Sequence, residues 1–202
     1  MFSLSRHRFG EAIETLRAAI HLDPYSPWLQ ARLGWALHLA GEPAASMQQI
    51  ERALTLFPEH ESAGLYGSLI LAYNGDAARG VQLAQEVAQR CPYLDLATAA
   101  HAYALACAGH ADEARAILRR LDWLSRERFV LNAFAAAAYV VLGKRDAALA
   151  ELRKSDQVRC PWFFQMLADP RLKPLHGDSE FAAMEALLAA MEAEAARDTE
   201  PE

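Results

Sequence analysis

The sequence predicts an all-α protein, a right-handed superhelical solenoid of antiparallel helix pairs, and two periodic patterns with the composition support this. Glycine recurs every 34 residues, at Gly41, Gly75, Gly109 and Gly143. Proline follows the same interval, at Pro24, Pro58 and Pro92. A fixed period of this length is typical of stacked repeats. The composition agrees, because 53% of the residues are apolar and alanine, a strong helix former, is heavily used.

The first predicted helix covers residues 9–22. Its apolar side chains recur at helical spacing, and Pro24 ends it, since proline disfavours helical geometry in the residue before it. The helix has the pattern of the second member of a pair, and only eight residues precede it. We therefore expect its apolar face to be uncovered and to be buried by a second copy of the chain in a homodimer. This face consists of Phe9, Ile13, Leu16 and Ile20.

The first complete unit is a helix, a glycine turn, a second helix and a proline stop. A helix over residues 27–40 begins at Ser26, whose side chain can cap it. Gly41 is expected to close this helix in the left-handed conformation. A partner helix over residues 43–56 follows, and Pro58 stops it.

The same unit recurs along the chain. The array divides into a half unit and four units, at 1–26, 27–60, 61–94, 95–128 and 129–160. Asp76 is a plausible cap for the second helix of the 61–94 unit. The glycine period survives residues 122–128, so these residues are predicted to lengthen a helix or a turn without adding an element.

Residues 161–202 form the predicted C-terminal part. It begins with a short helix and an extended proline-rich link. A final helix then runs from Asp178 or Ser179 to about residue 196, and its apolar face caps the array. The last residues, 197–202, are expected to fray.

The period and the helix–turn–helix unit with its closing proline resemble the tetratricopeptide repeat. Residues 27–60 match this pattern best, through Leu33, Gly34, Leu37, Ile50, Ala53 and Pro58. The later units match more loosely. The stretch from Trp162 to Phe181 also resembles the end of tetratricopeptide regions in bacterial signalling and transcription-regulator proteins.

The first helix of each unit carries a second apolar row. The resemblance implies that such positions line a concave groove that binds a partner protein. These residues are Trp28, Ala31, Trp35, Leu65, Leu69, Tyr73, Leu96, Tyr103 and Val130. Some arrays of the family hold a carboxylate with lysine and asparagine, but the matching positions here carry no charged donor. We therefore expect an apolar or amphipathic segment as the guest, and the chain's own CPWFFQML stretch is an alternative occupant.

No arrangement of residues indicates catalysis, a cofactor or a metal site. The histidines lack metal-ligand spacing, and HExxH, CxxC and GxSxG motifs are absent. The net charge of −6 argues against a nucleic-acid surface. The longest apolar stretch is too short to span a bilayer, which needs about 20 residues. Three cysteines without paired spacing favour reduced thiols and a cytoplasmic protein.

The predicted function is that of a non-catalytic scaffold for protein–protein interaction. The alternative is a regulatory segment of a bacterial signalling or transcription-regulator system, whose DNA-binding or catalytic domain is absent from this sequence. An enzyme is a distant third possibility.

Overall fold

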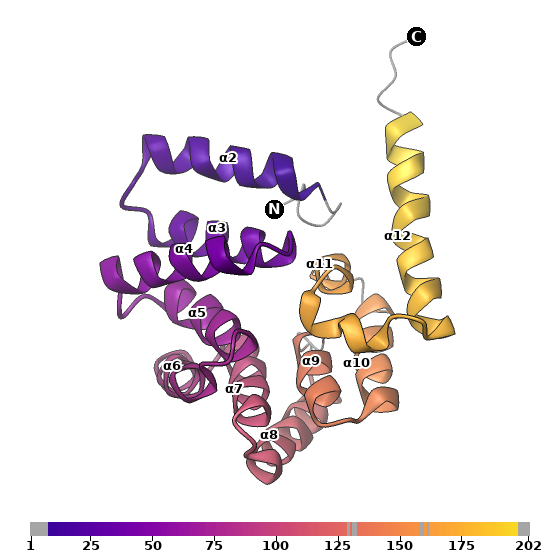
Figure 1. Ribbon diagram of the computed structural model, residues 1–202. Helices are drawn as coiled ribbons and strands as arrows, with labels where there is room; N and C mark the ends of the chain where they lie inside the picture. Colours follow the sequence, from indigo (N-terminus) through magenta and orange to yellow (C-terminus); the bar gives the residue numbers. More distant parts are fainter. Residues whose placement is uncertain (1–7, 129, 131–132, 158–159, 161, 198–202) are drawn as a thin grey trace.

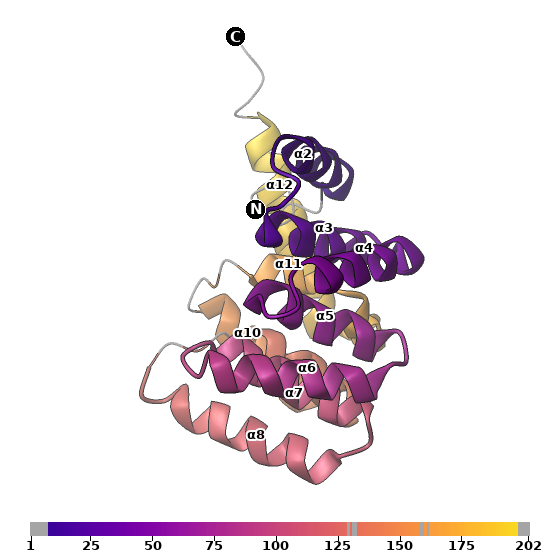
Figure 2. The same ribbon diagram turned by 90° about the vertical axis from the view of Figure 1, so that its left-hand side faces the viewer.

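A computed structural model describes residues 8–128, 130, 133–157, 160 and 162–197 of the 202-residue chain. The fold is an all-α solenoid, as predicted from the sequence (Figure 1). Its elements are α2 (Phe9–Leu22), α3 (Pro27–Leu39), α4 (Pro43–Leu56), α5 (Glu61–Tyr73), α6 (Ala77–Arg90), α7 (Asp95–Cys107), α8 (Ala111–Leu124), α9 (Ala133–Val141), α10 (Arg145–Gln157), α11 (Phe163–Leu167), the 3-10 helix η1 (Pro170–Leu175) and α12 (Ser179–Arg197). Figure 2 shows α2 to α8 stacked in succession.

The predicted turns and caps are confirmed. Gly41, Gly75, Gly109 and Gly143 all have positive φ, between 67° and 98°. This is the left-handed region, which side chains with a Cβ atom disfavour. The Ser26 and Asp76 side chains accept hydrogen bonds from the first turns of α3 and α6. Asp178 does the same for α12, accepting from the backbone of Glu180 and Phe181.

Small residues allow the two helices of a unit to approach closely. The Ser46 hydroxyl on α4 donates to the Gly34 carbonyl on α3 at 2.9 Å. Gly80 on α6 is closer still to its partner, because a Cβ atom there would lie 2.9 Å from the Ser68 carbonyl oxygen on α5. Backbone contacts of this kind leave no room for a larger residue, so the helix crossing depends on these positions.

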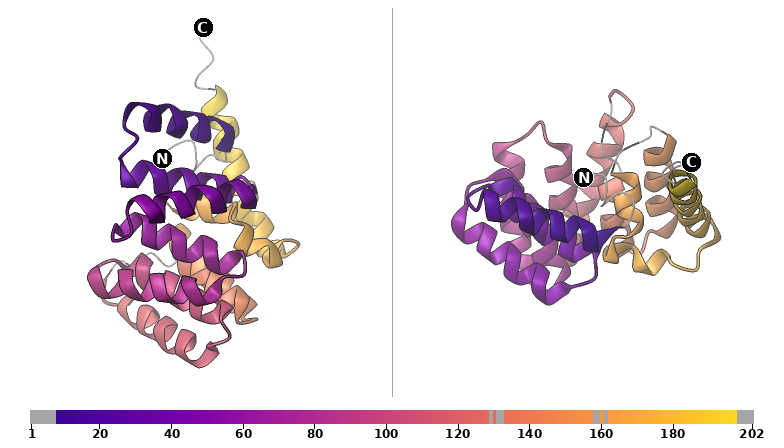
Figure 3. Two further views of the ribbon diagram at one scale, coloured as in Figure 1. Left: turned by 60° about the vertical axis from the view of Figure 1, so that its left-hand side comes forward. Right: turned by 90° about the horizontal axis from the view of Figure 1, so that it is seen from above.

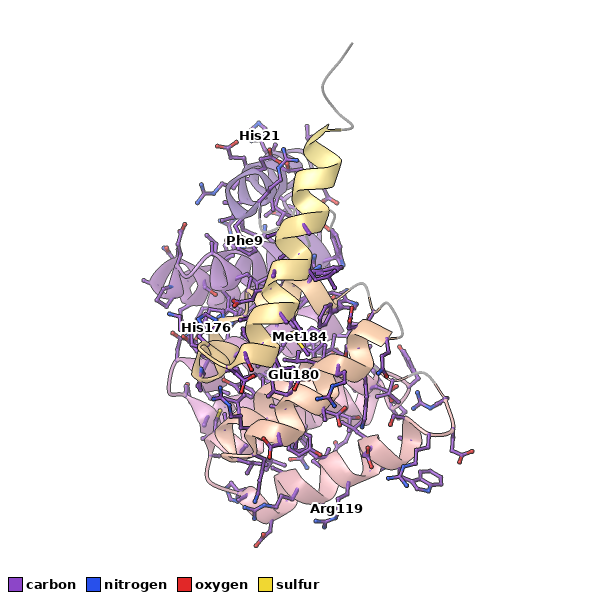
Figure 4. All side chains as sticks on the ribbon, turned by 90° about the vertical axis from the view of Figure 1, so that its right-hand side faces the viewer. Phe9, His21, Arg119, His176, Glu180 and Met184 are labelled. Atoms are coloured by element: carbon purple, nitrogen blue, oxygen red, sulfur yellow. The ribbon has the colours of Figure 1, made fainter. Side chains whose placement is uncertain are left out.

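The C-terminal part folds back onto the start of the array. Figures 1 and 3 place α11 between α3 and α10. In the same region His38, on α3, contacts Asp169, which lies 131 residues later. The helix α12 crosses a further side of the molecule, where Glu180 pairs with Arg153 of α10 (Figure 4). The array is therefore closed by its own C-terminal part.

One expectation from the sequence is wrong. The proline-rich link is not extended, because Pro170–Leu175 forms a 3-10 helix whose start is capped by the Asp169 side chain.

A fifth glycine, Gly177, also has positive φ and continues the 34-residue interval after Gly143. Residues 163–197 therefore have the layout of a fifth unit, with a first helix that is interrupted at Asp169 and Pro170.

The apolar face of α2 is not uncovered, contrary to the expectation. Ile13 is buried, while Phe9, Leu16 and Ile20 are half-buried and pack against the core. The reason is that α2 lies against α3 of the same chain, which covers the face assigned above to a second copy. A homodimer through this helix stays a prediction.

Candidate binding groove

Most of the predicted groove residues are buried. Trp28 and Tyr73 keep 45% and 36% of their surface exposed. The others are inaccessible: Ala31, Trp35, Leu65, Leu69, Leu96, Tyr103 and Val130. Trp35 in particular is fully buried, so it is a core residue here and not an open anchor for a partner. Partner binding at these positions stays a prediction, and it requires that something first uncover them.

The chain's own residues 162–175, which we call the C-terminal segment, lie against these positions. The Arg171 guanidinium carbon lies 5.3 Å from the centre of the Trp35 ring and 4.8 Å from that of Tyr103. The Trp162 ring meets Phe134 of α9 edge to face, with 5.6 Å between ring centres. The C-terminal segment thus contacts α3, α7 and α9, as a guest in the groove would.

Three side chains fasten the C-terminal segment, and we call them the latch: His38, Asp169 and Arg171. The Arg171 Nε donates to both Asp169 carboxylate oxygens at 2.9 Å, and Nε2 of His38 lies 3.3 Å from Oδ1. The latch is buried, and the His38 ring also stacks on the Trp35 ring, with 5.1 Å between the ring centres. Because an ionised carboxylate can only accept, Nε2 of His38 must carry the proton of this hydrogen bond.

The electrostatics of the latch favour an ionised pair. Burial alone would raise the pKa of Asp169, because it penalises the charged carboxylate. The charge of Arg171 and the hydrogen bonds from His38 and Arg171 outweigh burial and hold this pKa well below its usual range. Burial lowers the pKa of Arg171 in turn, but Asp169 more than reverses this, so both groups stay charged.

A second buried arginine lies near the start of the groove. Arg32, on α3, is only 1% exposed, and its Nη1 donates to the Tyr66 hydroxyl at 3.0 Å. Its guanidinium carbon lies 5.6 Å from the ring centre of Trp28, 5.8 Å from that of Tyr66 and 5.2 Å from that of Trp162. We call these four residues the Arg32 cluster. Within the described part of the chain, no carboxylate pairs with Arg32, and its Nη2 has no hydrogen-bond partner.

Neither buried arginine was predicted from the sequence. The positions at which the family presents lysine and asparagine do not include Arg32, which lies one residue after Ala31 of that set. A charged residue one position from an apolar row is normally exposed, so the pattern alone carried no signal. The presence of Arg32 and Arg171 means that the groove is not purely apolar.

The described residues show little that suggests other chemistry. Among them, no group of three or more His, Cys, Asp or Glu side chains is placed to hold a metal ion. No helix in the described ranges is both long and apolar enough to cross a bilayer. A pocket of about 350 Å³ lies between the α4–α5 turn and α6, lined by Pro58, Glu59, Glu86, Gln89 and Arg90, and it includes none of the groove residues.

Comparisons with known proteins support the same architecture. The family model "Tetratricopeptide repeat" matches residues 3–69. The fold resembles the crystal structure of a tetratricopeptide repeat protein from Parabacteroides merdae ATCC 43184, with a TM-score of 0.58, 15% sequence identity, and 93% of this chain and 80% of that chain covered. No curated protein matches the sequence.

Tetratricopeptide repeats generally mediate protein–protein interactions and are typically non-catalytic. The comparisons do not support the resemblance of the C-terminal part to bacterial signalling and transcription-regulator proteins, which stays a prediction. The chain is therefore similar to tetratricopeptide repeat proteins, by sequence over residues 3–69 and by fold over most of its length.

Proposed function

We propose that this protein is a non-catalytic interaction scaffold whose groove binds an apolar or amphipathic partner segment, and that the C-terminal segment occupies the groove until a partner replaces it. One observation supports this above all. The C-terminal segment reaches α3 through Asp169, which contacts His38 across 131 residues of sequence.

The contacts of the C-terminal segment describe the guest that the groove accepts. It brings aromatic and aliphatic side chains, with Phe163, Met166 and Leu167 buried. It also brings a buried acid, Asp169, and a buried base, Arg171, which neutralise each other inside the groove. A partner segment with a similar mixture would bury the same apolar area and satisfy His38. Apolar burial is then the main source of affinity, with aromatic side chains as anchors.

A peptide exchange experiment tests this proposal. In the full chain, Asp169→Asn weakens the latch while keeping the shape of the side chain. A fluorescent peptide spanning residues 160–176 is then titrated into this variant and into the unchanged chain, with anisotropy as the readout. We expect the peptide to bind the variant at least tenfold more tightly, because its own segment competes less well.

The matched control is the same peptide carrying Asp169→Asn, which should bind the variant more weakly than the unchanged peptide does. Circular dichroism establishes that the variant is folded. A folded variant that does not bind the peptide, or that binds it no more tightly than the unchanged chain does, would contradict the proposal. The C-terminal segment would then be a permanent part of the core. A role beside a separate signalling domain also stays a prediction, since no contact described here favours it.

A further inference from the structure

Arg32 is a buried cation for which the described residues provide no compensating anion. At 1% exposure it has lost nearly all contact with water, and the Tyr66 hydroxyl is its only hydrogen-bond acceptor among the described residues. Burial raises the pKa of Tyr66 and prevails over the opposing effect of Arg32, so this hydroxyl is neutral. Buried charges in proteins are normally paired, because an unpaired one loses hydration without a replacement.

The aromatic rings around Arg32 offset only part of this loss. The rings of Trp28, Tyr66 and Trp162 attract the guanidinium through their electron-rich faces. The rings do not replace an oxygen acceptor for the N–H groups of the guanidinium, however, and Nη2 of Arg32 has no hydrogen-bond partner. The indole Nε1 of Trp35, whose ring stacks on Tyr66 with 5.3 Å between centres, also lacks an acceptor. The cluster and the neighbouring Trp35 therefore offer a positive charge and two hydrogen-bond donors that have no acceptor.

The cluster also lies close to solvent. Trp28 keeps 45% of its surface exposed and Trp162 is half-buried, while the guanidinium beneath them is covered. Because Trp28 lies on α3, a rotation of its side chain would remove one of the rings that cover Arg32 without moving the C-terminal segment. Trp28 is thus placed as the cover of a site in which Arg32 is the charged group.

We propose that Arg32 anchors a binding site for an organic carboxylate with an apolar or aromatic body, which enters beside Trp28. The carboxylate would accept from Nη2 and neutralise the guanidinium, and the body would lie against the indole rings. Charge-assisted hydrogen bonds between guanidinium and carboxylate are about twice as strong as neutral ones. Inorganic phosphate fits this site less well, because it is more strongly hydrated and has no apolar part. The site does not require that the C-terminal segment leave the groove, so it is independent of the function proposed above.

The test uses the full chain with benzoate as the probe and benzamide as its neutral, isosteric control. Tryptophan fluorescence reports binding, since two indoles lie beside Arg32. We expect saturable binding of benzoate with a dissociation constant of roughly 1 mM, and at least tenfold weaker binding of benzamide. Benzoate should also raise the melting temperature, because a ligand that binds only the folded state stabilises it.

Variants assign the effect to Arg32. Arg32→Met should abolish benzoate binding, and Arg32→Lys, which keeps the charge but not the planar donor arrangement, should weaken it. Arg120→Met, on the exposed surface of α8, controls for the loss of one positive charge and should bind as the unchanged chain does. A second arm of the experiment measures binding of an acetylated tetrapeptide that ends in a phenylalanine carboxylate, with the C-terminal amide of the same peptide as control. Comparing its affinity with that of benzoate tells whether the site prefers small organic acids or the C-terminus of a peptide.

The outcomes separate clearly. Binding of benzoate or of the acid peptide that Arg32→Met abolishes and Arg120→Met leaves intact supports the site. The absence of saturation by either acid up to about 100-fold above the expected dissociation constant would overturn it. Binding that persists in Arg32→Met, or equal binding of benzamide, would overturn it as well. Should Arg32→Met fail to fold, the same decisions are read from Arg32→Lys.

Discussion

The latch and the Arg32 cluster each bury an arginine against aromatic rings, and they differ in what neutralises it. Arg171 is paired with Asp169, which is also held by His38. Arg32 has the neutral Tyr66 hydroxyl and three rings. Equal burial therefore has unequal consequences. Among the described residues, Nη1 of Arg171 and Nη2 of Arg32 both lack a hydrogen-bond partner. The charge of Arg171 is neutralised by Asp169 within the latch, which holds two distant parts together, whereas no carboxylate neutralises Arg32.

The largest expected effect is on the latch. Arg171→Met should lower the free energy of unfolding by about 3–5 kcal/mol, because it leaves the Asp169 carboxylate buried without its main partner. Urea denaturation measures this change. Arg32→Met is the matched comparison, and it should change the free energy of unfolding far less, since it strands no opposite charge. Equal losses in both variants would remove the distinction between the two regions.

Lowering the pH should destabilise the latch, which contains the carboxylate of Asp169, more than the Arg32 cluster, whose four residues include no carboxylate. The folded pKa of Asp169 lies below its unfolded value of about 3.9, so the carboxylate contributes stability above that pH. This contribution is lost as pH falls through the lowered folded pKa. Melting curves between pH 2 and 7 should therefore show a steeper acid loss for the unchanged chain than for Asp169→Asn. Parallel curves would mean that Asp169 does not stabilise the fold through its charge.

A turn variant provides a reference of intermediate size. Gly75 has φ of 98°, so Gly75→Val should destabilise the chain by about 1–2 kcal/mol or more. The effect is local, because a Cβ atom there would meet nothing within 4 Å. Thermal unfolding measures it. A larger loss than that of Arg171→Met would indicate that the turns, and not the latch, dominate the stability of the array.

The smallest effect is expected at an exposed ion pair. The Arg79 guanidinium donates to Glu51 at 2.7 Å, and this hydrogen bond lowers the pKa of Glu51, but both side chains are more than 40% exposed. Glu51→Gln should change the free energy of unfolding by about 0–1 kcal/mol, because water screens the pair. Adding salt should reduce this difference further. A loss comparable to that of Arg171→Met would show that burial does not explain the strength of the latch.

Much of the fold was predictable because the repeat is a local pattern. The bounds predicted for the helices at 9–22 and 43–56 agree with α2 and α4. Helix periodicity, a glycine turn and a proline stop all lie within one unit, so they can be read without knowledge of tertiary contacts. The fifth unit escaped detection because Asp169 and Pro170 interrupt its first helix, although Gly177 kept the interval.

The site was less predictable, since its properties arise only when distant segments meet. Trp35 lies on an apolar row that could have been either open or covered, and Arg171 covers it from 136 positions later in the sequence. Similarly, nothing local to Arg32 indicates that Trp162 lies beside it. Burial of an arginine depends on which segment closes over it, and periodicity within one helix contains no such information.

The contact between His38 and Asp169 also has a consequence for how the chain folds. In an open repeat array each unit touches only its neighbours, so units can form and melt from either end. Here the last unit packs on the first complete one, across 131 residues. Such a contact raises the mean sequence separation of native pairs, and docking of the C-terminal part must wait until the intervening helices have stacked. The array should consequently unfold as one cooperative body, without the stepwise fraying of an open solenoid.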